Sequence, residues 1–145
     1  AFKRCVNADL ANNLGNALAQ TGRLAEAASC YEAALQKRPT AQAHNNLGIV
    51  LARAQRGADA RAHFEAALRL RPDFADAHNN LGNLLAQAGE LDAAAGHYEA
   101  ALRTRPDLAD AEANWGNVLA QQGRIEAAVP HYEAALHVRP DQSTF

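Results

Sequence analysis

Residues 12–15 of the chain read NNLG, and the same four letters return at residues 45–48 and 79–82. A fourth, altered copy reads ANWG at residues 113–116, at the same offset from the third. Four prolines follow the same rhythm, at intervals of 33, 34 and 34 residues: Pro39, Pro72, Pro106 and Pro140. A repeat of about 34 residues indicates that several small units stack, because one unit alone cannot bury its apolar face.

Small and large residues recur at fixed places when Ala8, Ala41, Ala75 and Ala109 are taken as position 1 of each unit. Position 7 is Leu or Trp, position 8 is Gly, position 11 is Leu, positions 20 and 27 are Ala, and position 24 is aromatic. Positions 4, 7, 8 and 11 share one face of a predicted helix, and positions 20, 24, 27 and 28 share one face of a second. A glycine inside a helix costs about 0.5–1 kcal/mol relative to alanine, so four in register indicate close packing.

This pattern resembles the tetratricopeptide repeat (TPR) family, whose units read small-x-x-Leu-Gly-x-x-Leu, then Ala, an aromatic residue, Ala and Pro. The resemblance extends from residue 8 to residue 140 in four copies. It implies an all-α fold, a right-handed TPR superhelix (α-solenoid) of antiparallel helix pairs. The predicted divisions are 1–7 for the tail of a preceding repeat helix, 8–40, 41–74, 75–108 and 109–142 for the four repeats, and 143–145 for a terminal stub.

The departures from the family pattern are local. The family's usual tryptophan at position 4 is Ala11, His44, His78 and Glu112. In the second unit, Gln55 replaces the glycine of the turn and Gly57 replaces the leucine that follows it, so this helix start is predicted to be the weakest joint. In the fourth unit, Pro130 falls near the start of the second helix and is predicted to bend it slightly.

Composition limits the classes of partner. Hydrophobic residues make up 48% of the chain, and the net charge of −2 argues against a nucleic-acid or anionic-membrane surface. No apolar run approaches the ~20 residues of a membrane span. Cys5 and Cys30 lack metal-ligand spacing and suggest no disulfide framework, so a reducing cytoplasm is the expected location.

From the sequence we expect both ends to be bare, without the polar caps that repeat arrays need. Arg4 matches the arginine at position 31 of each unit, and the chain does not begin with methionine, so we expect it to come from a longer protein. One hypothesis that follows is self-assembly, with homo-oligomers formed by end-to-end stacking of the bare ends.

The resemblance also implies a binding surface. In TPR proteins the first helices line a concave face, with positions 2, 5, 6, 9, 12 and 13 pointing inward. The residues that this places in a peptide-binding groove are Asn13, Asn46, Asn80 and Asn114 at position 6, Asn12, Asn45 and Asn79 at position 5, Asn16, Asn83 and Asn117 at position 9, and Arg53 at position 13. An amide both donates and accepts hydrogen bonds, so a row of amides can bind the main chain of an extended peptide with loose sequence specificity. The alternatives are that position 6 holds a neighbouring helix or loop, and that positions 5 and 9 are plain solvent-facing polarity.

Three functions remain open at this stage. The first is a non-enzymatic protein–protein interaction scaffold that binds an extended peptide or a partner helix. The second is the substrate-recruiting part of a larger enzyme, because the asparagine ladder is similar to the TPR region of O-linked N-acetylglucosamine transferases and their bacterial relatives. The third is self-assembly. A clamp for a C-terminal carboxylate needs several basic residues on the concave face, and only Arg53 is available.

Recurring histidines and glutamates are interpreted as products of repeat duplication. The histidines are His44 and His78 at position 4 and His63, His97 and His131 at position 23. Residues one repeat apart lie too far apart to share one ion through ~2 Å bonds, so no metal or other cofactor is predicted. The glutamates at position 25 lack a paired base, and neither serine lies in a nucleophile motif, so no catalytic residue is predicted.

Overall fold

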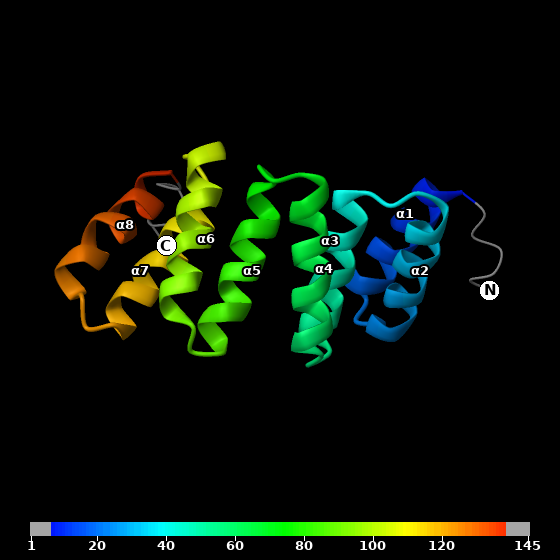
Figure 1. Cartoon of the computed structure of the whole chain (residues 1–145), viewed down its shortest axis with the longest axis horizontal. Coiled ribbons are helices and arrows are strands. Elements are labelled where there is room, and N and C mark those ends of the chain that lie inside the picture. Colours follow the sequence, from blue (N-terminus) through cyan, green and yellow to red (C-terminus); the bar gives the residue numbers. More distant parts are fainter. Residues whose placement is uncertain (1–6, 139–145) are drawn as a thin grey trace. The chain divides into compact units, whose positions relative to one another are not determined.

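The computed structural model describes residues 7–138 of the 145-residue chain (Figure 1). The predicted stub at 143–145, and residues 1–6 of the predicted preceding tail, lie outside this part. The described residues form eight helices and no strand, which confirms the all-α prediction. The chain divides into two compact units, Ala1–Pro72 and Asp73–Phe145.

Unit 1 contains two helix pairs. Its helices are α1 (Ala8–Gln20), α2 (Leu24–Lys37), α3 (Ala41–Arg53) and α4 (Gly57–Leu70). Helix α1 packs on α2, α2 packs on α3, and α3 packs on α4, with a smaller contact between α1 and α3. Short turns join neighbouring helices, so each runs antiparallel to the one before it (Figure 1). The first and third helices start with side-chain caps, in which Asn7 Oδ1 accepts from Asp9 N at 2.8 Å and Thr40 Oγ1 accepts from Ala43 N at 3.1 Å.

Unit 2 has the same internal arrangement. Its helices are α5 (Ala75–Gln87), α6 (Leu91–Thr104), α7 (Ala109–Gln121) and α8 (Ile125–Val138). Helix α5 packs on α6, α6 on α7, and α7 on α8, and α5 also contacts α7. Helix α8 continues through Pro130, its sixth residue, which has no N–H to donate and so removes one backbone hydrogen bond, and the slight bend expected there stays a prediction.

In each helix pair, the aromatic ring at position 24 of the second helix packs directly against the glycine at position 8 of the first helix. A Cβ atom added to Gly48 would lie 2.5 Å from Phe64 Cε1, and one added to Gly82 would lie 2.7 Å from Tyr98 Cε1. Both rings are almost completely buried. Only glycine leaves room for the ring at this distance, which is the packing reason for the register of glycines in the sequence.

The turn inside each helix pair shows what the replacement of glycine by Gln55 costs. The corresponding glycines, Gly22, Gly89 and Gly123, have left-handed backbone angles with φ between 79° and 84°. Gln55 is forced into the same region with φ of 65°, where a side chain costs about 1–2 kcal/mol. The second pair therefore carries strain at the place where the sequence predicts a weak joint.

Candidate functional site

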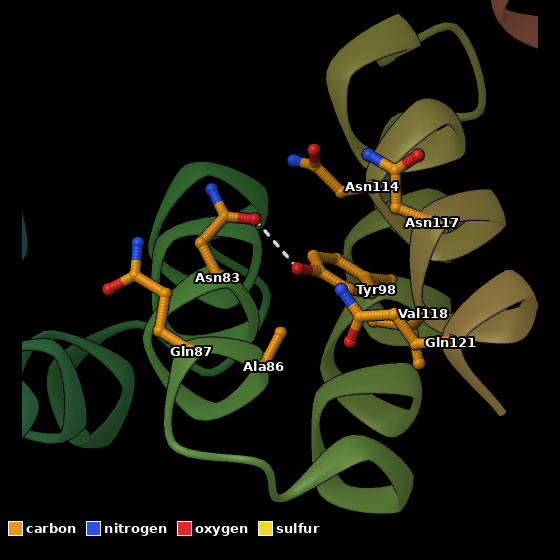
Figure 2. A pocket seen from close by; sticks show the side chains of 8 residues that line it. All are labelled: Asn83, Ala86, Gln87, Tyr98, Asn114, Asn117, Val118 and Gln121. Atoms are coloured by element: carbon orange, nitrogen blue, oxygen red, sulfur yellow. Dashed lines mark hydrogen bonds between the residues drawn. The ribbon is translucent and has the colours of Figure 1, made fainter.

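Each unit contains a pocket built from the same repeat positions. In both units the walls are positions 9, 12, 13 and 24 of one repeat and positions 6, 9 and 10 of the next. The first pocket, in unit 1, has a volume of about 250 Å³ and is lined by Asn16, Ala19, Gln20, Tyr31, Asn46, Ile49 and Val50. The second pocket, in unit 2, has a volume of about 270 Å³ and is lined by Asn83, Ala86, Gln87, Tyr98, Asn114, Asn117, Val118 and Gln121 (Figure 2).

A buried tyrosine holds the position 9 asparagine in each pocket. The Tyr98 hydroxyl donates to Asn83 Oδ1 at 2.7 Å (Figure 2). In the first pocket the Tyr31 hydroxyl donates to Asn16 Oδ1 at 2.6 Å. Burial raises the pKa of Tyr98 to about 12, so its hydroxyl keeps its proton at neutral pH and remains a donor. Because Oδ1 is occupied, the amide is oriented with its Nδ2 group as the available donor.

The position 9 and position 24 residues change together along the chain. A third pair, Tyr132 and Asn117, has the same bond at 2.7 Å. The second repeat has Phe64 in place of the tyrosine and Ile49 in place of the asparagine. Loss of the hydroxyl thus coincides with loss of its acceptor, and this pairing in the sequence is the signal that could have revealed the contribution of the tyrosines to the site.

The predicted position 6 asparagines do not share one environment. Asn46 and Asn114 line the pockets, Asn13 is exposed on α1, and Asn80 is half-buried on α5 and lines neither pocket. Asn46 Oδ1 accepts from Gln42 Nε2 at 2.9 Å within α3, which leaves its Nδ2 group as a donor. Asn114 Nδ2 donates to Asn79 Oδ1 at 3.2 Å, which leaves its Oδ1 as an acceptor.

The position 5 asparagines are half-buried or buried. Asn45 is 2% exposed and Asn79 is 8% exposed, and Asn79 accepts the hydrogen bond from Asn114. Asn12 is half-buried, and its Oδ1 is buried without a hydrogen-bond partner in the described structure. This burial differs from the solvent-facing alternative for position 5, whereas a ligand contact by Asn45 and Asn79 stays a prediction.

Two positions distinguish the pockets. At position 9 of the second wall, the first pocket has Ile49, which is 36% exposed, and the second has Asn117. At position 13 of the same helices, the first unit has Arg53 and the second has Gln121. Arg53 Nη1 donates to the carbonyl oxygen of Ala19, a residue of the pocket wall, at 3.2 Å. The two sites therefore share a frame and differ in polarity and charge.

The acidic residues at position 2 are partly neutralised by arginines of their own repeats. Asp9 pairs with Arg38 at 2.7 Å, and Asp76 pairs with Arg105 at 3.1 Å. These side chains are about half exposed or more, so each pair contributes little to stability. The pairs do reduce the negative charge that the sequence places along the edge of the first helices.

The histidines form contacts between positions 4 and 23 of the same repeat, which the spacing in the sequence does not predict. Within single repeats, His44 Nδ1 lies 3.0 Å from His63 Nδ1, and His78 Nδ1 lies 3.0 Å from His97 Nδ1. At the same positions in the fourth repeat, His131 Nδ1 lies 2.7 Å from Glu112 Oε2. A 3.0 Å separation is hydrogen-bonding distance, so one ring nitrogen of each pair can donate a proton to the other.

Burial and charge act together on the His44–His63 pair. Burial is the main cause that lowers the pKa of His44, followed by the charges of His63 and Arg69. Burial also lowers the pKa of His63, and Arg56 acts in the same sense, while Glu32 and Asp59 act against it. Both rings therefore favour the neutral form more than a free histidine does.

Residues 7–138 contain neither a membrane-spanning helix nor a cluster of metal ligands. No helix there is long and apolar enough to cross a membrane. The same residues contain no group of three or more His, Cys, Asp or Glu side chains that could hold a metal ion.

Two of the position 25 glutamates lie on helix surfaces beside arginines, with Glu65 3.3 Å from Arg61 and Glu99 3.6 Å from Arg103.

Comparison with known proteins identifies the kind of repeat. A family model described as Tetratricopeptide repeat matches residues 12–73, 51–109 and 113–145, which together cover most of the chain. A search of curated protein sequences gives no match.

Several solved structures have the same fold. A crystal structure of MamA aligns with a TM-score of 0.85 at 22% identity, covering 99% of this chain and 84% of that one. The structure of YrrB, described as a TPR protein with an unusual peptide-binding site, aligns with a TM-score of 0.78 at 26% identity, covering 95% and 72%. The structure of PilF from Pseudomonas aeruginosa aligns with a TM-score of 0.86 at 24% identity, covering 92% and 61%.

Proposed function

Because the chain belongs to the tetratricopeptide repeat family, we propose that it is a protein-interaction scaffold that binds the main chain of an extended peptide in its two amide-lined pockets. The observation that supports this most directly is the fixed orientation of the position 9 asparagines. A buried tyrosine hydroxyl holds Oδ1 of Asn16 and of Asn83, so each amide presents Nδ2 without first having to be ordered.

The second pocket matches the hydrogen-bonding needs of a peptide unit. A peptide unit has one carbonyl acceptor and one N–H donor. Asn83 Nδ2 supplies a donor and Asn114 Oδ1 supplies an acceptor, and both residues line the pocket (Figure 2). Neither contact reads a side chain, which fits a scaffold with loose sequence specificity. The peptide-binding site described for YrrB, which has the same fold, is consistent with this proposal.

Selection from a random peptide library tests the proposal directly. The 145-residue chain is immobilised and exposed to a phage library of random dodecapeptides. Retained sequences are then synthesised with a fluorescent label and measured by fluorescence polarisation. We expect binding that weakens about tenfold when Asn46 and Asn114 are both replaced by alanine, because each amide contributes about 0.5–1.5 kcal/mol through its hydrogen bonds.

A matched substitution separates binding from general surface effects. Gln36→Ala removes an exposed amide from α2 that lines neither pocket, so it should leave the affinity unchanged. If the double variant melts at a clearly lower temperature while binding is unchanged, the asparagines are structural. The failure of the wild-type chain to retain any peptide would refute the proposed function itself.

A further inference from the structure

We infer that the first pocket selects a peptide segment in which an aliphatic side chain lies next to a carboxylate, whereas the second pocket accepts a neutral polar residue. This inference rests on the proposed function, because it assigns side-chain preferences to the same two pockets. It follows from Ile49, at which the first wall differs from the second, and from Arg53, which contacts the wall residue Ala19.

Ile49 provides the aliphatic preference. It is the one wall position at which the first pocket has an apolar residue where the second has an amide, Asn117. With 36% of its surface exposed, Ile49 adjoins Val50, which is buried in the same wall. An aliphatic side chain placed here would cover apolar surface of Ile49 that otherwise faces water, and the favourable free energy scales with the area covered.

Arg53 provides the preference for a carboxylate. Ion pairs with carboxylates occupy several other arginines of the described chain, namely Arg23, Arg38, Arg56, Arg61, Arg103 and Arg105. Arg53 has no carboxylate partner within residues 7–138, and its Nη1 donates instead to the neutral carbonyl of Ala19. A guanidinium carries five N–H donors, so most of its donors remain available to an incoming anion.

The positive charge of Arg53 lies beside the first pocket. Ala19, the residue that anchors Arg53, is part of the pocket wall. The charge also acts on the tyrosine inside the pocket, because burial and Cys30 raise the pKa of Tyr31 while Arg53 opposes them. A carboxylate bound beside Ile49 would therefore lie within reach of an unpaired cation.

The second pocket offers neither feature. Asn117 Oδ1 accepts from Tyr132, and Gln121 occupies the position that corresponds to Arg53. Its walls present amides and no charged group, so a hydroxyl or amide side chain finds partners there, whereas a buried carboxylate would lack a cation. The two pockets thus differ in the peptide segment that each would select.

The chain supplies its own matched variants for the test. Arg53→Gln and Ile49→Asn each give the first pocket the residue that the second pocket has at the same repeat position. Arg61→Gln removes one positive charge from α4, which lines neither pocket, and controls for net charge. Library selections of dodecapeptides are run on the wild-type chain and on all three variants.

We expect wild-type selections to be enriched in peptides with Val, Ile or Leu adjacent to a carboxylate. A synthetic peptide from that set should bind Arg53→Gln about two- to fivefold more weakly, the range for solvent-exposed ion pairs, and this difference should shrink at high salt. It should bind Ile49→Asn about tenfold more weakly. Arg61→Gln should bind as tightly as the wild-type chain.

Two further peptide forms identify the source of the carboxylate. Changing the acidic residue to its amide, Glu to Gln or Asp to Asn, abolishes the preference if a side chain supplies it. Amidation of the C-terminus abolishes it if the chain end supplies it. Peptides that bind without any aliphatic or acidic enrichment, or with affinities unchanged in Arg53→Gln and Ile49→Asn, would overturn the inference and leave the proposed function intact. If no peptide binds the wild-type chain, both fall together.

Discussion

The contact between Gly82 and Tyr98 allows a sharp prediction, because the same chain contains a glycine at which the same substitution should have the opposite effect. A Cβ atom at Gly82 would lie 2.7 Å from Tyr98 Cε1 and 3.0 Å from Cδ1. Tyr98 is 1% exposed, so its ring has nowhere to move without displacing neighbouring side chains. Gly82→Ala should therefore destabilise the protein. Gly96, in the middle of α6, has no atom of another helix within 4 Å of the corresponding Cβ position.

The magnitudes follow from opposing contributions. Forcing a methyl group into a well-packed site costs about 1–3 kcal/mol. Replacing glycine by alanine in a helix returns about 0.5–1 kcal/mol. Displacement of the ring also weakens the Tyr98–Asn83 hydrogen bond, with a contribution of about 0.5–1.5 kcal/mol. We expect Gly82→Ala to lose about 1–3 kcal/mol overall and Gly96→Ala to gain about 0.5–1 kcal/mol.

Urea denaturation followed by circular dichroism at 222 nm measures both variants against the wild-type chain. Thermal melting should follow the same order, with a shift of about 2–4 °C for each kcal/mol. The packing argument would be refuted by a Gly82→Ala variant as stable as the wild-type protein. It would also be refuted if Gly96→Ala were destabilised as much as Gly82→Ala, since the effect would then belong to helical glycines in general.

Three other substitutions test separate parts of the structure. Gln55→Gly should stabilise the chain by about 1 kcal/mol in urea denaturation, because it removes a side chain from a left-handed turn, and a loss of stability would contradict this account. Tyr98→Phe should cost at most about 1.5 kcal/mol of stability yet weaken a peptide bound in the second pocket, because the amide of Asn83 is no longer held; unchanged binding in fluorescence polarisation would count against it. Because the pKa of His44 and that of His63 are lowered in the folded chain, the stability they contribute is present above about pH 6.5 and lost as the pH falls below it. Denaturation at pH 7.5 and 5.5 should show this loss, and His44→Gln should reduce it; a loss of the same size in the variant would exclude the histidine pair as its source.

The helices and their packing could be predicted from the sequence because each feature depends on neighbours at fixed spacing. A glycine at position 8 and an aromatic residue at position 24 recur in every repeat, and repetition turns a weak local signal into a strong one. The turn at Gln55 was predictable for the same reason, since three glycines define what that position requires.

The site was harder to predict because its geometry depends on contacts between helices. Asn45 and Asn79 are identical in type to the asparagines that follow them, and only the folded structure shows that they are buried. The histidine pairs join positions 4 and 23, which meet only after the second helix has folded back on the first. Spacing along one helix contains no information about that contact.

Packing and the proposed binding site are coupled in this chain through one ring. Glycine at position 8 admits the aromatic ring at position 24, and the hydroxyl on that ring fixes the asparagine at position 9. The second repeat separates the two roles, because Phe64 lies as close to Gly48 as any tyrosine lies to its glycine, while hydroxyl and asparagine are both missing. The ring alone therefore satisfies the fold, and the hydroxyl is needed only where an asparagine must be held. The tyrosine–asparagine pairs are therefore the residues at which function is expected. Specificity is expected at Ile49, because the second repeat has Ile49 and Phe64 in place of such a pair.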